Sequence, residues 1–187
     1  MRILVAAACL VLALGAGAAW VVEEEPVWYL RARYPLEYEH VIRAHARNYD
    51  LDPALLAAVV YAESRFDSAA RSEAGAVGLM QLLPGTAKGI ALRTGGDRFV
   101  VADLLDPEIN VRYGSWYLRH LRERYHDLRL ALAAYHAGQG NVDEWLRNGG
   151  GIGFPETRAY VDEVTKLRRV YAKAYRDELG LERSRTA

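Results

Sequence analysis

The sequence has a single cysteine, Cys9, and this residue lies in an N-terminal segment unlike the rest of the chain. Residues 23–187 therefore cannot form a disulfide or a thiolate metal site among themselves, and they contain no cysteine nucleophile. The chain also lacks an excess of one charge, because 24 Lys and Arg residues match 24 Asp and Glu residues. A chain without a basic surplus is a poor candidate for binding nucleic acid, so we expect no nucleic-acid partner.

The motifs of metal enzymes and of common hydrolases are missing as well. The histidines form no His-Glu-x-x-His motif and no compact ligand cluster; they are His40, His45, His120, His126 and His136. The sequence has no Gly-x-Ser-x-Gly nucleophile motif, and no glycine-rich phosphate loop that ends in Lys-Ser or Lys-Thr. We therefore expect no metal ion and no cofactor.

An uncharged apolar run spans residues 3–22, between Arg2 and three consecutive glutamates at 23–25. Twenty such residues in a helix can cross the hydrocarbon core of a bilayer, and the preceding positive charge favours an inside N-terminus. Small residues at 16–19 also resemble a signal-peptidase site. We predict that residues 1–22 are a signal peptide or a signal anchor. The rest of the chain is then extracytoplasmic, in the cell envelope, and is either anchored to the membrane or secreted.

Helix signals dominate the remaining sequence. Asp-Pro pairs at 52–53 and 106–107 combine an N-cap with proline at the first helical position. We expect helices over 36–49, from 53, over 84–92, from 107, over 128–137, over 141–146 and from 155. Alternating apolar residues are missing, apart from a short strand candidate at 76–83. The expected fold class is mainly α, a single domain over residues 36–175 behind an N-terminal hydrophobic helix. Residues 23–35 are expected to be a linker that docks onto it, and 176–187 a C-terminal tail.

One carboxylate, Glu63, occupies an apolar position of the second helix. Residues at helical spacing form that helix's apolar stripe, namely Leu55, Leu56, Val59, Val60 and Phe66. Glu63 falls on the same stripe, where burial and the negative end of the helix dipole both raise its pKa. An acid with a raised pKa can protonate a glycosidic oxygen near neutral pH. Alternatively, Glu63 lies at the edge of the stripe and pairs with Arg65 or Arg71, or reaches water.

A loop of small residues follows at 72–81, with the sequence Ser-Glu-Ala-Gly-Ala-Val-Gly-Leu-Met-Gln. Such a backbone can pass close to a sugar ring, although a tight hairpin packed on the core is an alternative. Four ordered blocks, joined by a matching stretch at 105–111, resemble those of the soluble lytic transglycosylase family of peptidoglycan-cleaving enzymes. The blocks are Glu-Ser-Arg-Phe at 63–66, 75–81 with Pro-Gly-Thr-Ala at 84–87, Ala-Ala-Tyr-His-Ala-Gly at 133–138, and Pro-Glu-Thr-Arg-Ala-Tyr-Val at 155–161.

The resemblance, which covers roughly residues 36–171, implies a lysozyme-like fold of the goose type with a saccharide cleft. It implies that Glu63 is the single catalytic acid and base. The substrate-binding positions that it implies are Ser72, Met80, Gln81, Tyr135, His136, Glu156 and Tyr160. Tyr135 and Tyr160 could equally be core residues with outward hydroxyls. His136 departs from the pattern, because the family usually has Asn there.

The activity that the resemblance implies is a lytic transglycosylase, a carbon–oxygen lyase acting on peptidoglycan glycan strands. It would cleave the MurNAc-β-1,4-GlcNAc bond without water and leave 1,6-anhydro-MurNAc ends. Two other functions stay open. A muramidase resembling goose-type lysozyme shares the fold and uses water. The other is a non-catalytic peptidoglycan-binding module, which would have little use for an acid such as Glu63 on an apolar stripe.

Overall fold

The computed structural model describes residues 24–181, so the predicted signal or anchor segment lies outside the described residues. The chain divides into two compact units between Pro35 and Leu36. The first unit contains helix α2 (Val27–Arg33), so the segment expected to be a linker is helical over seven residues. Within residues 24–181, none of the helices has the length and apolar character needed to cross a membrane.

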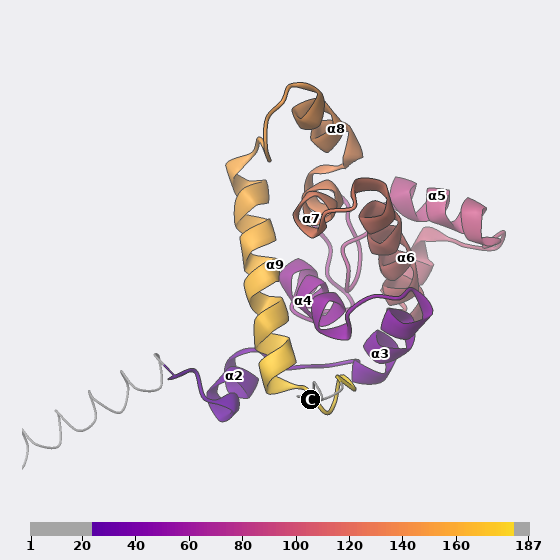
Figure 1. Ribbon diagram of the computed structural model, residues 1–187. Helices are drawn as coiled ribbons and strands as arrows, with labels where there is room; N and C mark the ends of the chain where they lie inside the picture. Colours follow the sequence, from indigo (N-terminus) through magenta and orange to yellow (C-terminus); the bar gives the residue numbers. More distant parts are fainter. Residues whose placement is uncertain (1–23, 182–187) are drawn as a thin grey trace, which may run out of the picture. The chain divides into compact units, whose positions relative to one another are not determined.

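The second unit consists of helices joined by loops (Figure 1). The helices are α3 (Glu39–Asn48), α4 (Pro53–Ser64), α5 (Pro84–Thr94), the 3₁₀ helix η1 (Val101–Leu105), α6 (Pro107–Tyr125), α7 (Leu128–Ala137), α8 (Gln139–Arg147) and α9 (Pro155–Ala174). The prediction of a mainly helical fold is confirmed. The strand candidate at 76–83 is wrong, since the described part of the chain has only isolated bridges there. Positive φ angles at Gly75, Gly78 and Gln81 turn that backbone back on itself.

Helix α4 lies at the centre of the second unit, with α3 and α9 packed against it (Figure 1). It begins as predicted, because the Asp52 carboxylate accepts a hydrogen bond from the Ala54 amide at 2.8 Å. All residues from 54 to 60 are buried, so the expected single apolar stripe is wrong and the helix is enclosed on all sides. Phe66 lies beyond the helix end, after Arg65 at φ 53°, and is buried by a left-handed turn.

Helix α9 packs along α4 and α7 (Figure 1). Its buried face has the predicted spacing and includes Tyr160, Val161, Val164, Leu167 and Tyr171. Helix α7 has the predicted bounds and ends at Gly138, whose φ is 86°. Helix α8 begins at Gln139, two residues earlier than predicted. Asn141 lies within the helix, and its Nδ2 donates to the Ala137 carbonyl at 2.7 Å.

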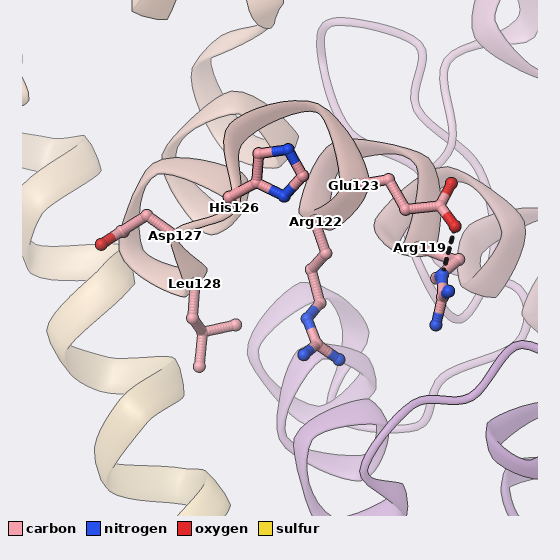
Figure 2. Close-up of a pocket in the computed structure, with 6 residues that line it drawn as sticks. All are labelled: Arg119, Arg122, Glu123, His126, Asp127 and Leu128. Carbon is pink, nitrogen blue, oxygen red and sulfur yellow. Dashed lines mark hydrogen bonds and ion pairs between the residues drawn. The ribbon is translucent and has the colours of Figure 1, made fainter.

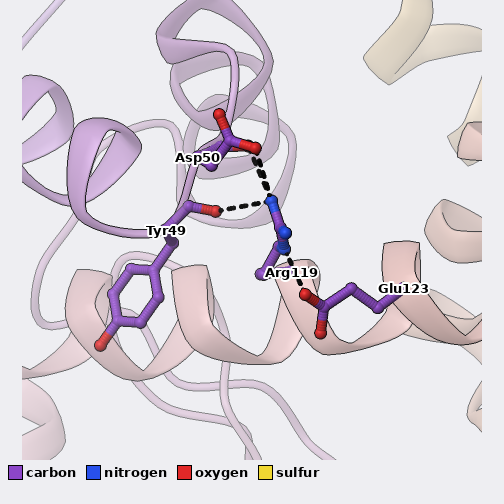
Figure 3. Close-up of polar contacts among 4 residues, drawn as sticks. All are labelled: Tyr49, Asp50, Arg119 and Glu123. Carbon is purple, nitrogen blue, oxygen red and sulfur yellow. Dashed lines mark hydrogen bonds and ion pairs between the residues drawn. The ribbon is translucent and has the colours of Figure 1, made fainter.

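Arg119 ties helix α6 to the turn that follows α3 (Figure 3). Its Nη1 donates to the Asp50 carboxylate at 2.8 Å and to the Tyr49 carbonyl at 3.5 Å, while its Nε donates to Glu123 at 2.7 Å. The Asp50 side chain is almost fully exposed, so this ion pair contributes little energy. Its effect is geometric, because it joins α6 to the turn that follows α3.

Candidate active site

A cavity of about 420 Å³ lies where the C-terminal ends of α4 and α7 meet the loop at 72–83, and this volume is typical of small-ligand sites. Its lining residues are Glu63, Ser72, Ala74, Ala76, Gln81, Leu82, Leu83, Thr86, Tyr117, Tyr135, His136, Ala137 and Gly138. The structure therefore brings together five of the predicted site residues. It also adds Tyr117 of α6, which was not among the predicted site residues.

Glu63 is the only carboxylate among the lining residues of this cavity within the described chain. The Tyr160 hydroxyl donates a hydrogen bond to its Oε1 at 2.6 Å. Burial raises the pKa of Glu63 to about 7, and the hydrogen bond from Tyr160 partly opposes this by favouring the ionised form. Among residues 24–181, neither Arg65 nor Arg71 pairs with it, so the predicted alternative of an ion pair is wrong. At neutral pH an acid with this pKa is protonated in a large fraction of the molecules and ionised in the rest.

Tyr135 connects α7 to the loop at 72–83. Its hydroxyl donates to the Met80 carbonyl at 2.8 Å, and its ring lies 5.5 Å from the ring of Tyr117. Burial, together with the nearby Glu63 carboxylate, raises the pKa of Tyr135 well above its ordinary value. The hydroxyls of Tyr135 and Tyr160 are thus both bonded inward, and the alternative of core tyrosines with outward hydroxyls is wrong.

The His136 ring packs against Tyr160, with centroids 4.6 Å apart and an interplanar angle of 31°. Its Nδ1 lies 3.1 Å from the hydroxyl of Thr157, a buried residue that sequence reasoning missed. Burial lowers the pKa of His136, and the Glu156 carboxylate partly opposes this. Glu156 itself is exposed in the first turn of α9 and does not line the cavity.

Met80 occupies a different place from the one expected of a glycan-binding side chain. It is fully buried, and it fills the space over Gly114 of α6, where even an added methyl group would collide with it. The Met80 side chain therefore has no exposed surface with which to touch a sugar. We correct its predicted role to one of support, since its carbonyl accepts the hydrogen bond from Tyr135.

Ser72 and Gln81 line the cavity and also shape the loop that carries them. The Ser72 hydroxyl accepts a hydrogen bond from the Ala76 amide at 3.0 Å. The Gln81 amide donates to the carbonyls of Ala70 at 3.2 Å and Gly78 at 3.0 Å. These bonds hold both side chains at the cavity wall before any ligand arrives.

Asn110 of α6 is the buried anchor of this loop, and sequence reasoning gave it no role. Its Oδ1 accepts from the Met80 amide at 2.8 Å, while its Nδ2 donates to the carbonyls of Val77 at 2.9 Å and Leu104 at 2.8 Å. The available signal was its place in the stretch at 105–111 that matches the family. The loop thus depends on one side chain about thirty residues away.

A second cavity of similar volume, about 430 Å³, lies at the opposite end of α7 (Figure 2). It is lined by Arg119, Arg122, Glu123, His126, Asp127 and Leu128. Figure 2 shows Glu123 turned toward Arg119, and the Asp127 carboxylate caps α7 by accepting from the Leu130 amide. Both acids are therefore engaged in structural contacts. The ten residues of α7 separate this cavity from the first by about 15 Å.

Metal binding has no support in residues 24–181, where no group of three or more His, Cys, Asp or Glu side chains could hold an ion.

Comparison with solved structures places the fold among the lytic transglycosylases. The inactive mutant of the lytic transglycosylase Slt from Pseudomonas aeruginosa, with Gln in place of a Glu, has a TM-score of 0.71 and 32% identity. The match covers 86% of this chain and 29% of that one. The 70 kDa soluble lytic transglycosylase of Escherichia coli has a TM-score of 0.74 and 30% identity over 83% of this chain and 27% of that one. These matches confirm the lysozyme-like fold class expected from the resemblance.

Sequence comparison agrees. The soluble lytic murein transglycosylase of Salmonella typhimurium is 34% identical over 164 residues, which is 81% of this chain and 25% of that protein. The transglycosylase of Enterobacteria phage PRD1 is 40% identical over 110 residues, which is 59% of this chain and 38% of that protein. This chain thus spans about a quarter of the length of its soluble relatives from Salmonella and Escherichia coli. Residues 40–154, more than half of the chain, match the transglycosylase SLT domain, and the chain belongs to this family.

Proposed function

We propose that this protein is a peptidoglycan lytic transglycosylase that cleaves the MurNAc-β-1,4-GlcNAc bond without consuming water. The observation that carries the proposal is Glu63, a carboxylic acid with a pKa of about 7 at the wall of a ligand-sized cavity. A group with this pKa can donate a proton and then accept one at neutral pH. The relative from Pseudomonas aeruginosa, inactive with Gln in place of a Glu, supports an essential acid in the family.

In the proposed reaction, Glu63 donates its proton to the glycosidic oxygen, and the bond from that oxygen to C1 of the muramic acid breaks. The 2-acetamido oxygen of the same sugar bonds to C1 and stabilises the positive charge that develops there. The Glu63 carboxylate then removes the proton of the 6-hydroxyl, and O6 bonds to C1 as the acetamido oxygen leaves. The first proton leaves on the GlcNAc hydroxyl, the proton from O6 regenerates the Glu63 acid, and the product carries a 1,6-anhydro ring.

The cavity favours this scheme over a mechanism with two carboxylates. Glycosidases that use water place a second Asp or Glu opposite the acid, whereas substrate-assisted enzymes do not need one. Within the described residues, the cavity lining supplies only Glu63 as a carboxylate. The nearby acids Asp67 and Glu73 are exposed, and neither lines the cavity.

The neighbouring side chains have distinct proposed roles. Ser72, Gln81 and His136 are proposed to hydrogen-bond the sugar substituents, since all three line the cavity. Tyr160 orients the Glu63 carboxyl through its 2.6 Å hydrogen bond. Tyr135 is proposed to support the cavity wall, since its hydroxyl is bonded inward. Glu156 is exposed on α9, and its proposed support of the wall rests on the matching motif at 155–161.

The test is digestion of purified peptidoglycan with the full chain, followed by mass spectrometry of the released muropeptides. We expect products with 1,6-anhydro ends, each lighter by one water than the corresponding reducing-end product. Reducing ends would instead establish a muramidase. Binding without cleavage would indicate a binding module.

Two matched variants assign the acid. Glu63→Gln keeps the shape of the side chain and removes its proton, so we expect no anhydro product. Glu73→Gln makes the same change at an exposed position of the neighbouring loop and should cleave like the unmodified protein. Cleavage by the Glu63→Gln variant would refute the assignment.

We also propose that residues 1–22 direct the domain across the membrane and that it works in the cell envelope. The apolar run at 3–22 and the membrane-bound lytic murein transglycosylase F of Pseudomonas fluorescens, 34% identical over 123 residues, support this location. N-terminal sequencing of the mature protein from a membrane and a soluble fraction tests it. A chain that begins near residue 20 in the soluble fraction indicates cleavage, and an intact chain in the membrane fraction indicates an anchor.

A further inference from the structure

The His136 imidazole lies in the middle of a chain of contacts that ends at the proposed catalytic acid. Thr157 contacts its Nδ1 at 3.1 Å, its ring packs on Tyr160 at 4.6 Å, and Tyr160 donates to Glu63 at 2.6 Å. The ring therefore contacts two residues of α9, Thr157 in its first turn and Tyr160, which donates to Glu63. At the same time it lines the cavity, so one side of the imidazole faces the ligand space.

The contact with Thr157 indicates which protonation state of the His136 ring allows the Thr157 hydroxyl to form its hydrogen bond. Thr157 is fully buried, and its hydroxyl has no other hydrogen bond within residues 24–181. A buried hydroxyl is costly unless its hydrogen finds an acceptor, and the neutral His136 Nδ1 provides one. With Nδ1 as the acceptor, the single hydrogen of the neutral ring lies on Nε2.

We propose that His136 is a positioning residue for Glu63: Thr157 holds the neutral imidazole, with its hydrogen on Nε2, against Tyr160, and protonation of the imidazole disrupts this support. The inference rests on the proposed function, in which Glu63 is the acid that Tyr160 orients. Protonation places a hydrogen on Nδ1, so the Thr157 hydroxyl must turn its own hydrogen away into a buried space. It also places a positive charge beside Tyr160, in the direction of Glu63.

The charged and titratable groups around the ring set its preference for the neutral form. Tyr160 and Glu156 face it from α9, Tyr135 precedes it on α7, and Glu63 reaches Tyr160 from α4. Burial favours the neutral imidazole, and Glu156 only partly offsets this preference. The cleavage activity should therefore have two pH limits. The upper limit follows ionisation of Glu63, and the lower limit follows protonation of His136.

Three variants separate this role from simple packing. In His136→Asn, the amide oxygen replaces Nδ1 as the acceptor for Thr157 but does not titrate. Its kcat should therefore lose the lower pH limit, because the side chain at position 136 no longer takes up a proton. In His136→Gln, the amide reaches the Nε2 position instead, so Thr157 loses its acceptor and kcat should fall by about tenfold or more at every pH. Thr157→Val removes the donor that favours the neutral ring, so the lower limit should move to higher pH.

The experiment measures kcat and KM against pH for the full chain and the three variants, with muropeptide release as the assay. Nitrogen-15 NMR of the same proteins reads the His136 tautomer directly, because the His136→Asn spectrum identifies its signal among the five histidines. We expect the hydrogen on Nε2 in the unmodified protein. A hydrogen on Nδ1, or an unchanged lower limit in His136→Asn, would overturn the proposal.

The NMR readout also separates the two proposals. Carbon-13 NMR follows the titration of the Glu63 carboxyl and does not require cleavage. If the unmodified chain forms no anhydro product, the proposed function fails. The positioning role is then decided by whether the Glu63 titration differs between the unmodified chain and His136→Gln. If cleavage occurs, but His136→Gln leaves the Glu63 titration unchanged and the His136 hydrogen lies on Nδ1, only the positioning role fails.

Discussion

Replacement of the proposed catalytic acid should stabilise the protein at alkaline pH and leave its stability unchanged at acid pH. Glu63 has a pKa of about 7 in the folded protein against an ordinary value of 4.5. The folded state therefore binds this proton more tightly than the unfolded state. The stability that the proton contributes is complete below pH 4.5, and it is lost as pH rises to about 7.

The size of the effect follows from the same two values. Each pH unit corresponds to about 1.4 kcal/mol, so the rise from 4.5 to about 7 is worth at most ~3.5 kcal/mol. The Glu63 side chain keeps some contact with water, so we expect about 2–3 kcal/mol in practice. Glu63→Gln removes the charge and can still accept the Tyr160 hydrogen bond. At pH 8 it should therefore raise the free energy of unfolding by this amount, and Tm by roughly 5–10 °C.

Urea unfolding of the unmodified chain and of Glu63→Gln at pH 4.5 and pH 8 measures the effect, with the four tryptophans as the fluorescent probe. Glu73→Gln is the control, because the exposed Glu73 should show no comparable dependence on pH. An equal gain at both pH values would mean that Gln simply packs better. No gain at pH 8 would mean that Glu63 ionises normally, and the argument for a neutral-pH acid would be refuted. Neither conclusion depends on a cleavage assay.

Three further substitutions test the surroundings of the acid. Tyr160→Phe removes a hydrogen bond that favours the ionised form of Glu63, so the pKa of Glu63 should rise. The upper pH limit of muropeptide release should then move to higher pH, and an unchanged limit would contradict the orienting role. Tyr135→Phe leaves the Met80 carbonyl without its donor and should lower the free energy of unfolding by about 1–3 kcal/mol in urea titrations, whereas a loss near zero would show that water replaces the hydroxyl. Gly78→Ala should cost about 3 kcal/mol or more by the same measurement, because its φ is +80° and a Cβ would lie 2.2 Å from Asn110 Nδ2. Gly75→Ala, with φ +81° and open space around it, is the matched control and should cost only about 1–2 kcal/mol; equal losses would rule out the clash as the cause.

The sequence by itself determined most of the helices and singled out Glu63 as the proposed acid. Capping and helical spacing act within a few residues, so Asp52 and Asp106 marked the starts of α4 and α6 correctly. The motif around Glu63 selected one carboxylate among 24 acidic residues. The same local signals failed where the chain leaves a helix. Phe66 continued the apolar pattern but lies beyond the left-handed turn that ends α4.

Only the tertiary structure decided what surrounds the acid. The hydrogen bond from Tyr160 to Glu63 joins residues 97 positions apart, and Asn110 reaches Met80 across 30. The family motif predicted Met80 as a substrate-binding residue, yet its side chain is buried in the core against Gly114. A pKa also depends on how much water and which donors the folded chain leaves around a group. Local sequence can therefore name the carboxylate, while its proton affinity arises only when α4, α7 and α9 come together.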